Sequence, residues 1–232
     1  MTTSACNRPQ SLPRHVAVVG AAGGLGQGVL RMCRAEGIAF TAIVRSRPER
    51  IVDLPQGSQV VVVTSLADRE ALTKAFAGAD VVIIATGVTA TSDDRSARLS
   101  ENAAELEAAM LAAGVDRIII TNTLLASMPG SVASRAMRFF SKVPGRIGRG
   151  AREQQAVIDA VGKGAFSRVR WTIARAGLNS RGKNEPPVAA ADWAGAQNSW
   201  MPVSYDAMAR WMLEEATDNQ YVGAAPIVSR RR

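Results

Sequence analysis

The sequence predicts an α/β fold, a doubly wound parallel sheet between two layers of helices, on the basis of three observations. Short runs of Val and Ile without polar alternation recur along the chain, as in strands buried on both faces of a parallel sheet. Stretches with helical spacing separate these runs. Closely spaced glycines stand between the first run and the first helical stretch.

Predicted strands and helices alternate along almost the whole chain. Strands are expected at residues 15–20, 40–44, 60–64, 81–85, 117–121 and 171–174, with a late piece around 227–228. Helices are expected at residues 25–36, 68–77, 97–113, 134–142, 153–161 and 207–217. Because connections between parallel strands are right-handed, this order leaves few topologies for a single domain.

Composition argues against several functional classes. With 232 residues, 47% of them hydrophobic and 21% charged, the chain suits one globular domain with a sizeable core. A single histidine, His15, argues against His-based catalysis and a multi-His metal site, so no metal is expected. Cys6 and Cys33 cannot build a disulfide framework, which favours a reduced, cytoplasmic protein. No apolar run reaches the roughly 20 residues of a membrane-spanning helix.

The net charge of +8 is concentrated in a few places. Residues 135–152 carry six cations and no acidic residue, basic residues follow the second strand, and the chain ends on three arginines. Such an excess calls for an acidic partner: nucleic acid, a membrane surface or a phosphorylated small molecule. Because the excess is local and few aromatic residues could stack on bases, no nucleic-acid partner is expected.

The strongest motif is the run VAVVGAAGGLG at residues 16–26. Gly20 permits a tight turn, Gly23 and Gly24 let the backbone approach a pyrophosphate, and Gly26 lets the helix pack on the strand. The N-terminus of the following helix offers free N–H groups to phosphates. The spacing is GxxGxxG, and its strand–turn–helix context predicts a Rossmann-type dinucleotide site. The alternative is a glycine-rich turn without a ligand.

A basic stretch, Arg45-Ser46-Arg47, follows the second strand, where an NAD-binding domain places an acidic residue for the ribose 2′-hydroxyl. A guanidinium can pair with a 2′-phosphate and stack on adenine. The sequence therefore predicts NADP(H) in preference to NAD(H). The alternative is that Arg45, Arg47 and Arg50 belong to a solvated loop.

From about residue 15 to residue 228, the chain resembles atypical short-chain dehydrogenase/reductases. It is most similar to the NAD(P)-binding group that includes NmrA-like proteins and biliverdin/flavin reductases. Besides the glycine loop and Arg45, the resemblance rests on residues 75–82 (AFAGADVV), 113–118 (AGVDRI), 171–177 (WTIARAG) and 203–209 (VSYDAMA). These motifs indicate the group and leave the substrate open.

The resemblance implies a set of cofactor-binding residues at the ends of the strands. With the glycine loop, the expected set is Gly20, Ala22, Gly23, Gly24, Leu25, Gly26, Arg45, Arg47, Ser65, Leu66, Ala85, Thr86, Gly87, Thr121, Arg149, Ala176 and Gly177. Ala176 stands where the family usually has Pro. Asn122 and Thr123 occupy the place of a Ser pair that faces nicotinamide and substrate. The candidate catalytic residues are Asn122, Thr123, Ser127 and Lys142.

One departure from the family concerns its Tyr-x-x-x-Lys pair, which precedes the helix expected to begin near Glu153. Counting back places Gly145 at the Tyr position and Arg149 at the Lys position. The two tyrosines, Tyr205 and Tyr221, lie far downstream. The usual tyrosine acid for carbonyl reduction is therefore missing, and Arg is a poor proton donor near neutral pH. Hydride transfer to a conjugated acceptor could instead use solvent protons.

The basic stretch 135–152 has three interpretations. It is an anionic-substrate site or lid, a solvated surface with Met137, Phe139 and Phe140 packed beneath it, or a membrane-binding surface. Trp193 and Trp200 would either contact an aromatic substrate or pack against the domain.

The domain organisation follows from these motifs. Residues 1–14, with two prolines and no signal-peptide core, are expected to form a flexible tail. Residues 15–232 are expected to form a single NAD(P)-binding Rossmann domain with substrate-side insertions at 124–152 and 177–203. The predicted function is NADPH-dependent reduction of a small conjugated or carbonyl substrate, anionic or aromatic. The alternatives are a non-catalytic NADP(H)-sensing regulator and an epimerase or dehydratase. The oligomeric state stays open.

Overall fold

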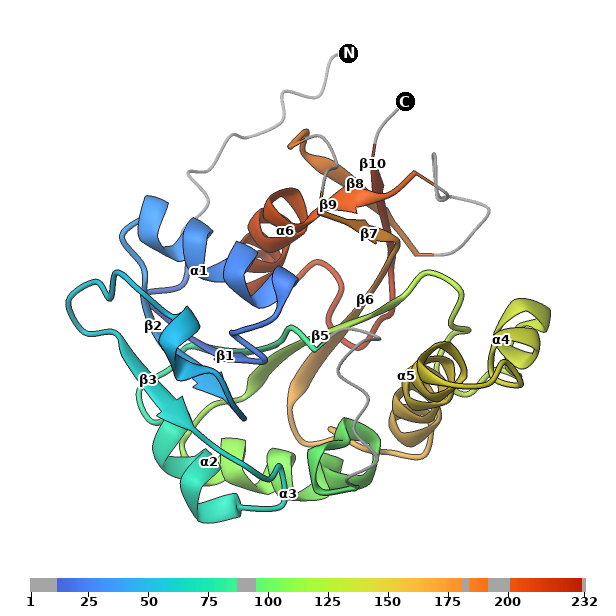
Figure 1. The fold of residues 1–232 in the computed structure, drawn as a ribbon, viewed down its shortest axis with the longest axis horizontal. Helices are drawn as coiled ribbons and strands as arrows, with labels where there is room; N and C mark the ends of the chain where they lie inside the picture. The colour runs from blue at the N-terminus through green and yellow to red at the C-terminus, as the bar shows by residue number, and fades with distance from the viewer. Residues whose placement is uncertain (1–11, 87–94, 181–183, 192–200, 231–232) are drawn as a thin grey trace, which may run out of the picture.

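The computed structural model describes residues 12–86, 95–180, 184–191 and 201–230, and it confirms the three-layer α/β architecture (Figure 1). Eight strands form one sheet in the order β3-β2-β1-β4-β5-β6-β10-β8. Their bounds are β1 His15–Val19, β2 Ala39–Val44, β3 Gln59–Val62, β4 Val81–Ile84, β5 Arg117–Thr123, β6 Arg170–Ala176, β8 Pro187–Ala190 and β10 Ile227–Arg230. All neighbouring strands are parallel except β8 and β10.

Helices cover both faces of the sheet (Figure 1). The helices are α1 Gly24–Ala35, α2 Arg69–Phe76, α3 Leu99–Ala112, α4 Arg135–Phe140, α5 Arg146–Gly162 and α6 Tyr205–Asp218, with short 3-10 turns at Pro48–Arg50 and Arg95–Ala97. Apolar residues of α1 and α6 form one core with one face of the sheet. Apolar residues of α2, α3 and α5 form a second core on the opposite face.

The alternation of side chains along β1 shows how one strand serves both cores. Val16 and Val18 point to the core of α1 and α6. Ala17 and Val19 point to the core of α2, α3 and α5. Successive side chains of a strand leave opposite faces, so a strand between two helix layers must be apolar at every position. This requirement explains the uninterrupted Val and Ile runs of the sequence.

The strand β8 was missing from the sequence prediction, which left residues 177–202 without a strand. It runs antiparallel to β10 at the edge of the sheet, with Val188 opposite Ser229. Pro187 begins it, which is tolerated there because an edge strand need not donate every N–H to a neighbour. A separate parallel pair joins β7 (Leu178–Asn179) to β9 (Val203–Ser204) and leads directly into α6.

The helix α5 begins at Arg146, so the expected start near Glu153 was wrong. Gly145 precedes the helix with a φ of 78°, a left-handed conformation that favours glycine. Gly148 lies so close to the carbonyl of Val143 that an added Cβ would meet that oxygen at 1.8 Å. Gly148 is therefore required by close packing, and Arg149 lies inside the first turn of the helix.

The start of the described chain contacts the domain before β1 begins. The backbone N–H of Arg14 donates to Asp80 (2.7 Å), and Leu12 packs against the core of α1 and α6. The last residues of the expected tail are thus held in place. None of the described helices is long and apolar enough to cross a membrane.

Candidate cofactor site

A cavity of about 650 Å³ opens where the sheet reverses its winding. The strand β1 pairs with β2 on one side and with β4 on the other, so the connections leave in opposite directions and a crevice forms at the strand ends. The described lining residues are Val19, Gly20, Ala22, Gly23, Gly24, Leu25, Ile43, Val44, Arg45, Ser46, Arg47, Arg50, Val63, Thr64, Leu66, Ala85, Thr86, Thr121, Asn122, Thr123, Gln154, Ala176, Gly177, Leu178 and Tyr205.

The glycine loop forms one wall of the cavity. Gly20 has a φ of 83°, which turns the chain sharply at the end of β1. A Cβ on Gly26 would meet the carbonyl oxygen of Gly20 at 2.3 Å, so only glycine allows this closeness of helix and loop. Gly26 accordingly lies beneath the loop and does not line the cavity. The arrangement leaves the N-terminus of α1 open toward the cavity, as an anion-binding site requires.

Tyr205, the first residue of α6, lies against the N-terminus of α1. A Cβ on Gly24 would be 2.6 Å from the Tyr205 ring, and a Cβ on Gly28 would be 3.0 Å from the Tyr205 carbonyl oxygen. The ion pair between Arg31 and Asp206 (2.5 Å) joins the same two helices. A tyrosine that is distant in sequence therefore borders the glycine-loop end of the cavity.

The arginines after β2 lie beside the glycine loop. Arg50 donates from Nη1 to the carbonyl of Ala22 (3.4 Å), and its own carbonyl accepts from Gln27 (3.3 Å). Arg47 adopts a left-handed φ of 63° at the start of the 3-10 turn. Within the described residues, no carboxylate forms an ion pair with Arg45 or Arg47, so both guanidinium groups are available to an anion.

The ends of β3 and β4 supply another part of the cavity lining, and it includes Leu66, Ala85 and Thr86 from the expected cofactor-binding set. Ser65 is not in the lining; its hydroxyl accepts a hydrogen bond from the backbone of Ala67 (3.0 Å). Gly87 lies outside the described residues.

The opposite end of the cavity is built on β5 and α5. The buried Asn122 side chain donates to the carbonyl of Gln154 (3.0 Å) and accepts from the backbone N–H of Thr123 (2.7 Å). The same N–H also donates to Gln154 Oε1 (3.0 Å). Asn122 thus positions the strand end. Thr123 Oγ1 accepts only a long bond from Leu125 (3.4 Å), so its hydroxyl hydrogen is available for a ligand.

Ionisable groups in the described lining are restricted to Arg45, Arg47, Arg50 and Tyr205. No described Asp, Glu, His, Lys or Cys lines the cavity, and the end with Asn122 and Thr123 is neutral. A protein group that exchanges protons readily near pH 7 is therefore absent from the described lining.

Three further predicted residues lie away from the cavity lining. Ser127 donates to the carbonyl of Val132 (2.9 Å), Lys142 is exposed after α4, and Arg149 lies in the first turn of α5. The predicted catalytic pair Asn122 and Thr123 does line the cavity. Trp193 and Trp200 lie outside the described residues.

Sequence reasoning missed Gln154, Leu178 and Tyr205 as lining residues. Gln154 lies on a helix whose start was misplaced, Leu178 begins the two-residue strand β7, and Tyr205 directly follows the two-residue strand β9. The serine before Tyr205 was the available signal, because Ser204 accepts from the N–H of Ala207 (3.1 Å) and so begins the helix.

A buried arginine, Arg175, supports the same end of the site. It is 1% exposed and donates from Nε to the carbonyl of Ala225 (2.7 Å) and from Nη1 to the carbonyl of Ala126 (2.8 Å). It therefore links β6 to the loop that leaves Thr123.

Comparisons with known proteins agree with this geometry. The family described as NAD(P)H-binding matches residues 20–219. No curated protein matches the sequence significantly. Similar solved structures include the oxidoreductase ylbE from Lactococcus lactis, which is 16% identical, with 94% of this chain and 91% of that chain covered and a TM-score of 0.70.

Two other solved structures share the fold. A short-chain dehydrogenase/reductase from Veillonella parvula in complex with NADP is 17% identical, covering 94% of this chain and 95% of that chain at a TM-score of 0.66. A Rossmann-fold NAD(P)-binding family protein from Shigella flexneri is 19% identical, covering 94% and 93% at a TM-score of 0.63. With the family match over most of its length, its glycine cradle and its available arginines, the chain belongs to the NAD(P)H-binding family.

Proposed function

We propose that this protein is an NADPH-dependent oxidoreductase that reduces a small conjugated or carbonyl substrate without a Tyr-x-x-x-Lys acid. One observation carries the proposal: a single cavity joins two unpaired arginines beside the glycine loop to a neutral end at Asn122, Thr123 and Gln154. The first end suits a phosphorylated dinucleotide. The second end suits an acceptor that needs orientation more than acid catalysis.

Different residues along the cavity bind the cofactor and orient the acceptor. The N–H groups at the start of α1 hold the pyrophosphate, and Arg45 and Arg47 pair with the 2′-phosphate. When bound, the nicotinamide supplies a hydride. The Thr123 hydroxyl orients the acceptor by donating a hydrogen bond, and Asn122 fixes the backbone that carries it. The proton that completes the reduction comes from solvent, since the described lining holds no suitable acid.

Cofactor choice is tested by measuring the dissociation constants of NADPH and NADH. The variant Arg45→Ala/Arg47→Ala is expected to weaken NADPH binding by roughly tenfold or more, because it loses charge-assisted bonds to the 2′-phosphate. NADH binding should change little. The variant Arg69→Ala/Lys163→Ala removes two exposed cations outside the described lining and serves as a charge-matched control. Equal affinity of the wild-type protein for both cofactors would contradict the preference.

Catalysis is tested by following NADPH oxidation with flavins, quinones and enones. Thr123→Val keeps the shape of the side chain and removes the hydroxyl, so kcat/KM should fall by about tenfold while NADPH binding is unchanged. Thr73→Val, on α2 and away from the cavity, is the matched control. If NADPH binds and no acceptor of these classes is reduced, the proposal fails.

The neutral cavity end also favours a second candidate, a non-catalytic NADP(H)-binding regulator. Such a protein would bind a partner protein with an affinity that differs between NADP and NADPH. Absence of turnover together with a cofactor-dependent change in partner affinity would favour this candidate. An epimerase or dehydratase is less well supported, because the described lining offers no acid–base pair.

A further inference from the structure

Residues 135–152, hereafter the cationic segment, comprise α4, the connection to α5 and the first turns of α5. Six cations and no acidic residue lie in it. Arg135, Arg138, Lys142 and Arg146 are exposed. Among the described residues, none of these four has a carboxylate partner. Their charge is therefore available to an external anionic surface.

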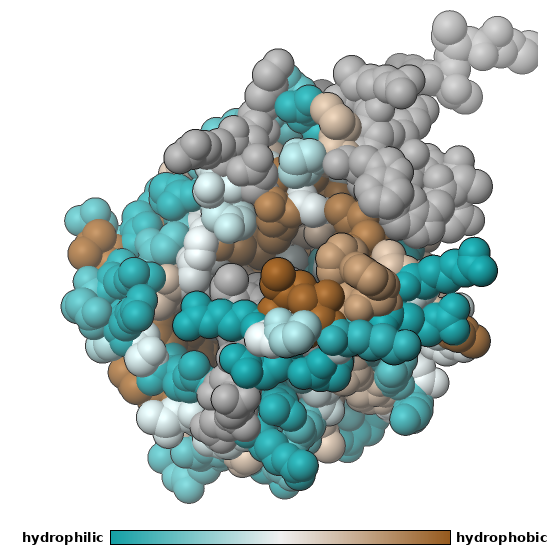
Figure 2. All heavy atoms as spheres, turned by 45° about the vertical axis from the view of Figure 1, so that its right-hand side comes forward, coloured by the Kyte–Doolittle hydropathy of each residue, from teal (hydrophilic) through white to brown (hydrophobic). Residues whose placement is uncertain are grey.

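Large apolar side chains are exposed in and beside the same segment. Phe139 is 67% exposed and Ile147 is 57% exposed, and the adjoining Val132 is 83% exposed. Val132 and Phe139 are the two most exposed large apolar residues of the described chain. The interpretation that Phe139 and Phe140 pack beneath the charges was wrong; only Met137 does so, at 2% exposure. Figure 2 shows apolar side chains set among hydrophilic ones on this side of the molecule.

The fold holds these apolar side chains outward. Ser134 caps α4 by accepting from the N–H of Met137 (3.1 Å) and donates to the carbonyl of Leu125 (2.7 Å). Arg152 donates to the carbonyl of Ser141 and so ties α5 to the end of α4 (2.5 Å). The phenyl rings of Phe139 and Phe140 contact edge to face with centroids 5.5 Å apart. An ordered element, and not a loose loop, presents the segment to its surroundings.

We propose that the cationic segment docks on an anionic phospholipid membrane surface. Guanidinium and ammonium groups pair with anionic headgroups, while exposed Phe and Ile side chains enter the boundary between headgroups and acyl chains. The segment follows β5 and leads to Gln154 in the cavity lining. Because the segment follows the carboxyl end of β5, docking turns the cofactor-site edge of the sheet toward the bilayer.

Charge and composition favour lipid over other occupants. A second copy of this chain would bring like charges together. A protein interface is depleted of charged residues at its centre, whereas here cations stand between the apolar side chains. Nucleic acid would use the cations and could stack on the exposed Phe139 ring, but it would leave the aliphatic Ile147 and Val132 side chains without an apolar layer to enter. Only a surface with both anionic groups and an accessible apolar layer uses both features.

The test is flotation of the full-length protein with vesicles of phosphatidylcholine alone or mixed with phosphatidylserine, at near-physiological salt. Wild-type protein should bind the mixed vesicles and not the neutral ones. Arg138→Glu/Lys142→Glu should lower binding by roughly tenfold or more, because two attractions become repulsions. Phe139→Ser/Ile147→Ser should lower it by roughly tenfold without any change in charge.

Matched controls separate this site from the basic character of the whole chain. Arg69→Glu/Lys163→Glu changes the net charge equally, and Val62→Ser removes another exposed apolar side chain (51% exposed). Both controls should bind the mixed vesicles within about twofold of wild type. NADPH binding verifies that each variant is folded.

Three outcomes would overturn the proposal. Wild-type protein could fail to bind the mixed vesicles. The controls could lose as much binding as the segment variants, which would show a diffuse charge effect. Binding could depend on Arg138 and Lys142 but not on Phe139 and Ile147, which would indicate a purely electrostatic surface for an acidic protein or another polyanion.

Discussion

At the scale of single residues, the contact between Gly24 and Tyr205 explains why a glycine is required at the start of α1. The ring occupies the space that a Cβ on Gly24 would need, 2.6 Å from its nearest carbon. Gly24 therefore serves two purposes, since it admits a phosphate to the helix N-terminus and admits the tyrosine beside it.

We expect Gly24→Ala to weaken NADPH binding by roughly tenfold, because the added methyl group displaces the Tyr205 ring at the phosphate-binding end. Adding Tyr205→Ala should restore part of the affinity, since the two side chains no longer compete for space. Titration calorimetry of both variants measures the coupling. Strictly additive losses in the double variant would refute the steric explanation.

His15 gives the stability a pH dependence. Burial lowers the pKa of His15, and the nearby Asp80 opposes this only in part. Its Nε2 lies 3.0 Å from Thr41 Oγ1. Below the unfolded-state pKa of about 6.5, the unfolded chain binds a proton that the folded chain resists. Above about pH 6.5, His15 is neutral in both states and has no effect on the free energy of unfolding. As the pH drops from about 6.5 to the folded-state pKa, the free energy of unfolding falls.

We expect His15→Gln to reduce this acid sensitivity. As the pH falls below about 6.5, the free energy of unfolding measured in urea should decrease less for the variant than for wild type. Comparing the two proteins at each pH removes the contributions of the carboxyl groups. A difference that does not vary with pH would exclude His15 as the source.

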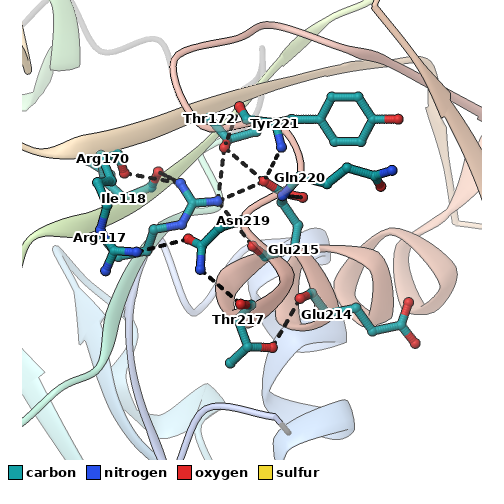
Figure 3. Close-up of polar contacts among 10 residues, drawn as sticks. All are labelled: Arg117, Ile118, Arg170, Thr172, Glu214, Glu215, Thr217, Asn219, Gln220 and Tyr221. Carbon is teal, nitrogen blue, oxygen red and sulfur yellow. Dashed lines mark hydrogen bonds and ion pairs between the residues drawn. The ribbon is translucent and has the colours of Figure 1, made fainter. Parts of the chain in front are cut away.

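At the scale of elements, a buried ion pair fastens α6 to the sheet (Figure 3). Arg117 on β5 donates to Glu215 on α6 (2.8 Å) and to the hydroxyl of Thr172 on β6 (2.9 Å), and both charged side chains are at most 2% exposed. Glu215 also accepts from the backbone of Gln220 and Tyr221. Burial lowers the pKa of Arg117 to about 10, so it is still charged at neutral pH.

We expect Glu215→Ala to lower the free energy of unfolding by about 3–5 kcal/mol, because it leaves a buried guanidinium without its partner. The double variant Arg117→Met/Glu215→Leu should be less destabilised than the single variant, since no buried charge remains. Glu70→Ala is the control, because its pair with Lys74 is exposed to solvent and should contribute little to stability. Urea unfolding measures all three. Equal losses for Glu215→Ala and Glu70→Ala would contradict the role of burial.

At the scale of the whole molecule, the cavity exists because the sheet reverses its winding between β1 and β4. The described lining residues come from the ends of the six strands β1 to β6 and from α1, α5 and α6. A ligand that fills it contacts both halves of the sheet, so binding should stabilise the domain as a unit.

We expect NADPH at about a hundred times its dissociation constant to add about 2.7 kcal/mol of stability. For a domain of this size, that corresponds to a rise in Tm of roughly 5–10 °C. Thermal unfolding with NADPH or NADH measures it, and Arg45→Ala/Arg47→Ala should lose most of the NADPH effect at the same concentration. An unchanged Tm with saturating NADPH would contradict the assignment of the cavity.

Much of the fold could be predicted because its signals are local. Uninterrupted Val and Ile runs located the seven parallel strands, and the glycine loop located the phosphate end of the site. Two errors had physical causes. The first two turns of α5 contain Gly148, which close packing on Val143 requires, and an edge position let Pro187 begin a strand. Neither packing nor an edge position can be read from neighbouring residues.

The parallel sheet, the glycine loop and the basic residues after β2 could be predicted from the amino-acid sequence, because each depends on residues that are close in the chain. The packed domain was needed to show that Tyr205 borders the glycine loop and that Gln154 holds the end of β5. It was also needed to show that Phe139 is exposed and that Ser127 and Lys142 lie away from the cavity lining. The reason is distance along the chain: contacts such as Arg31–Asp206 join residues 175 positions apart, and only packing of the whole domain brings them together.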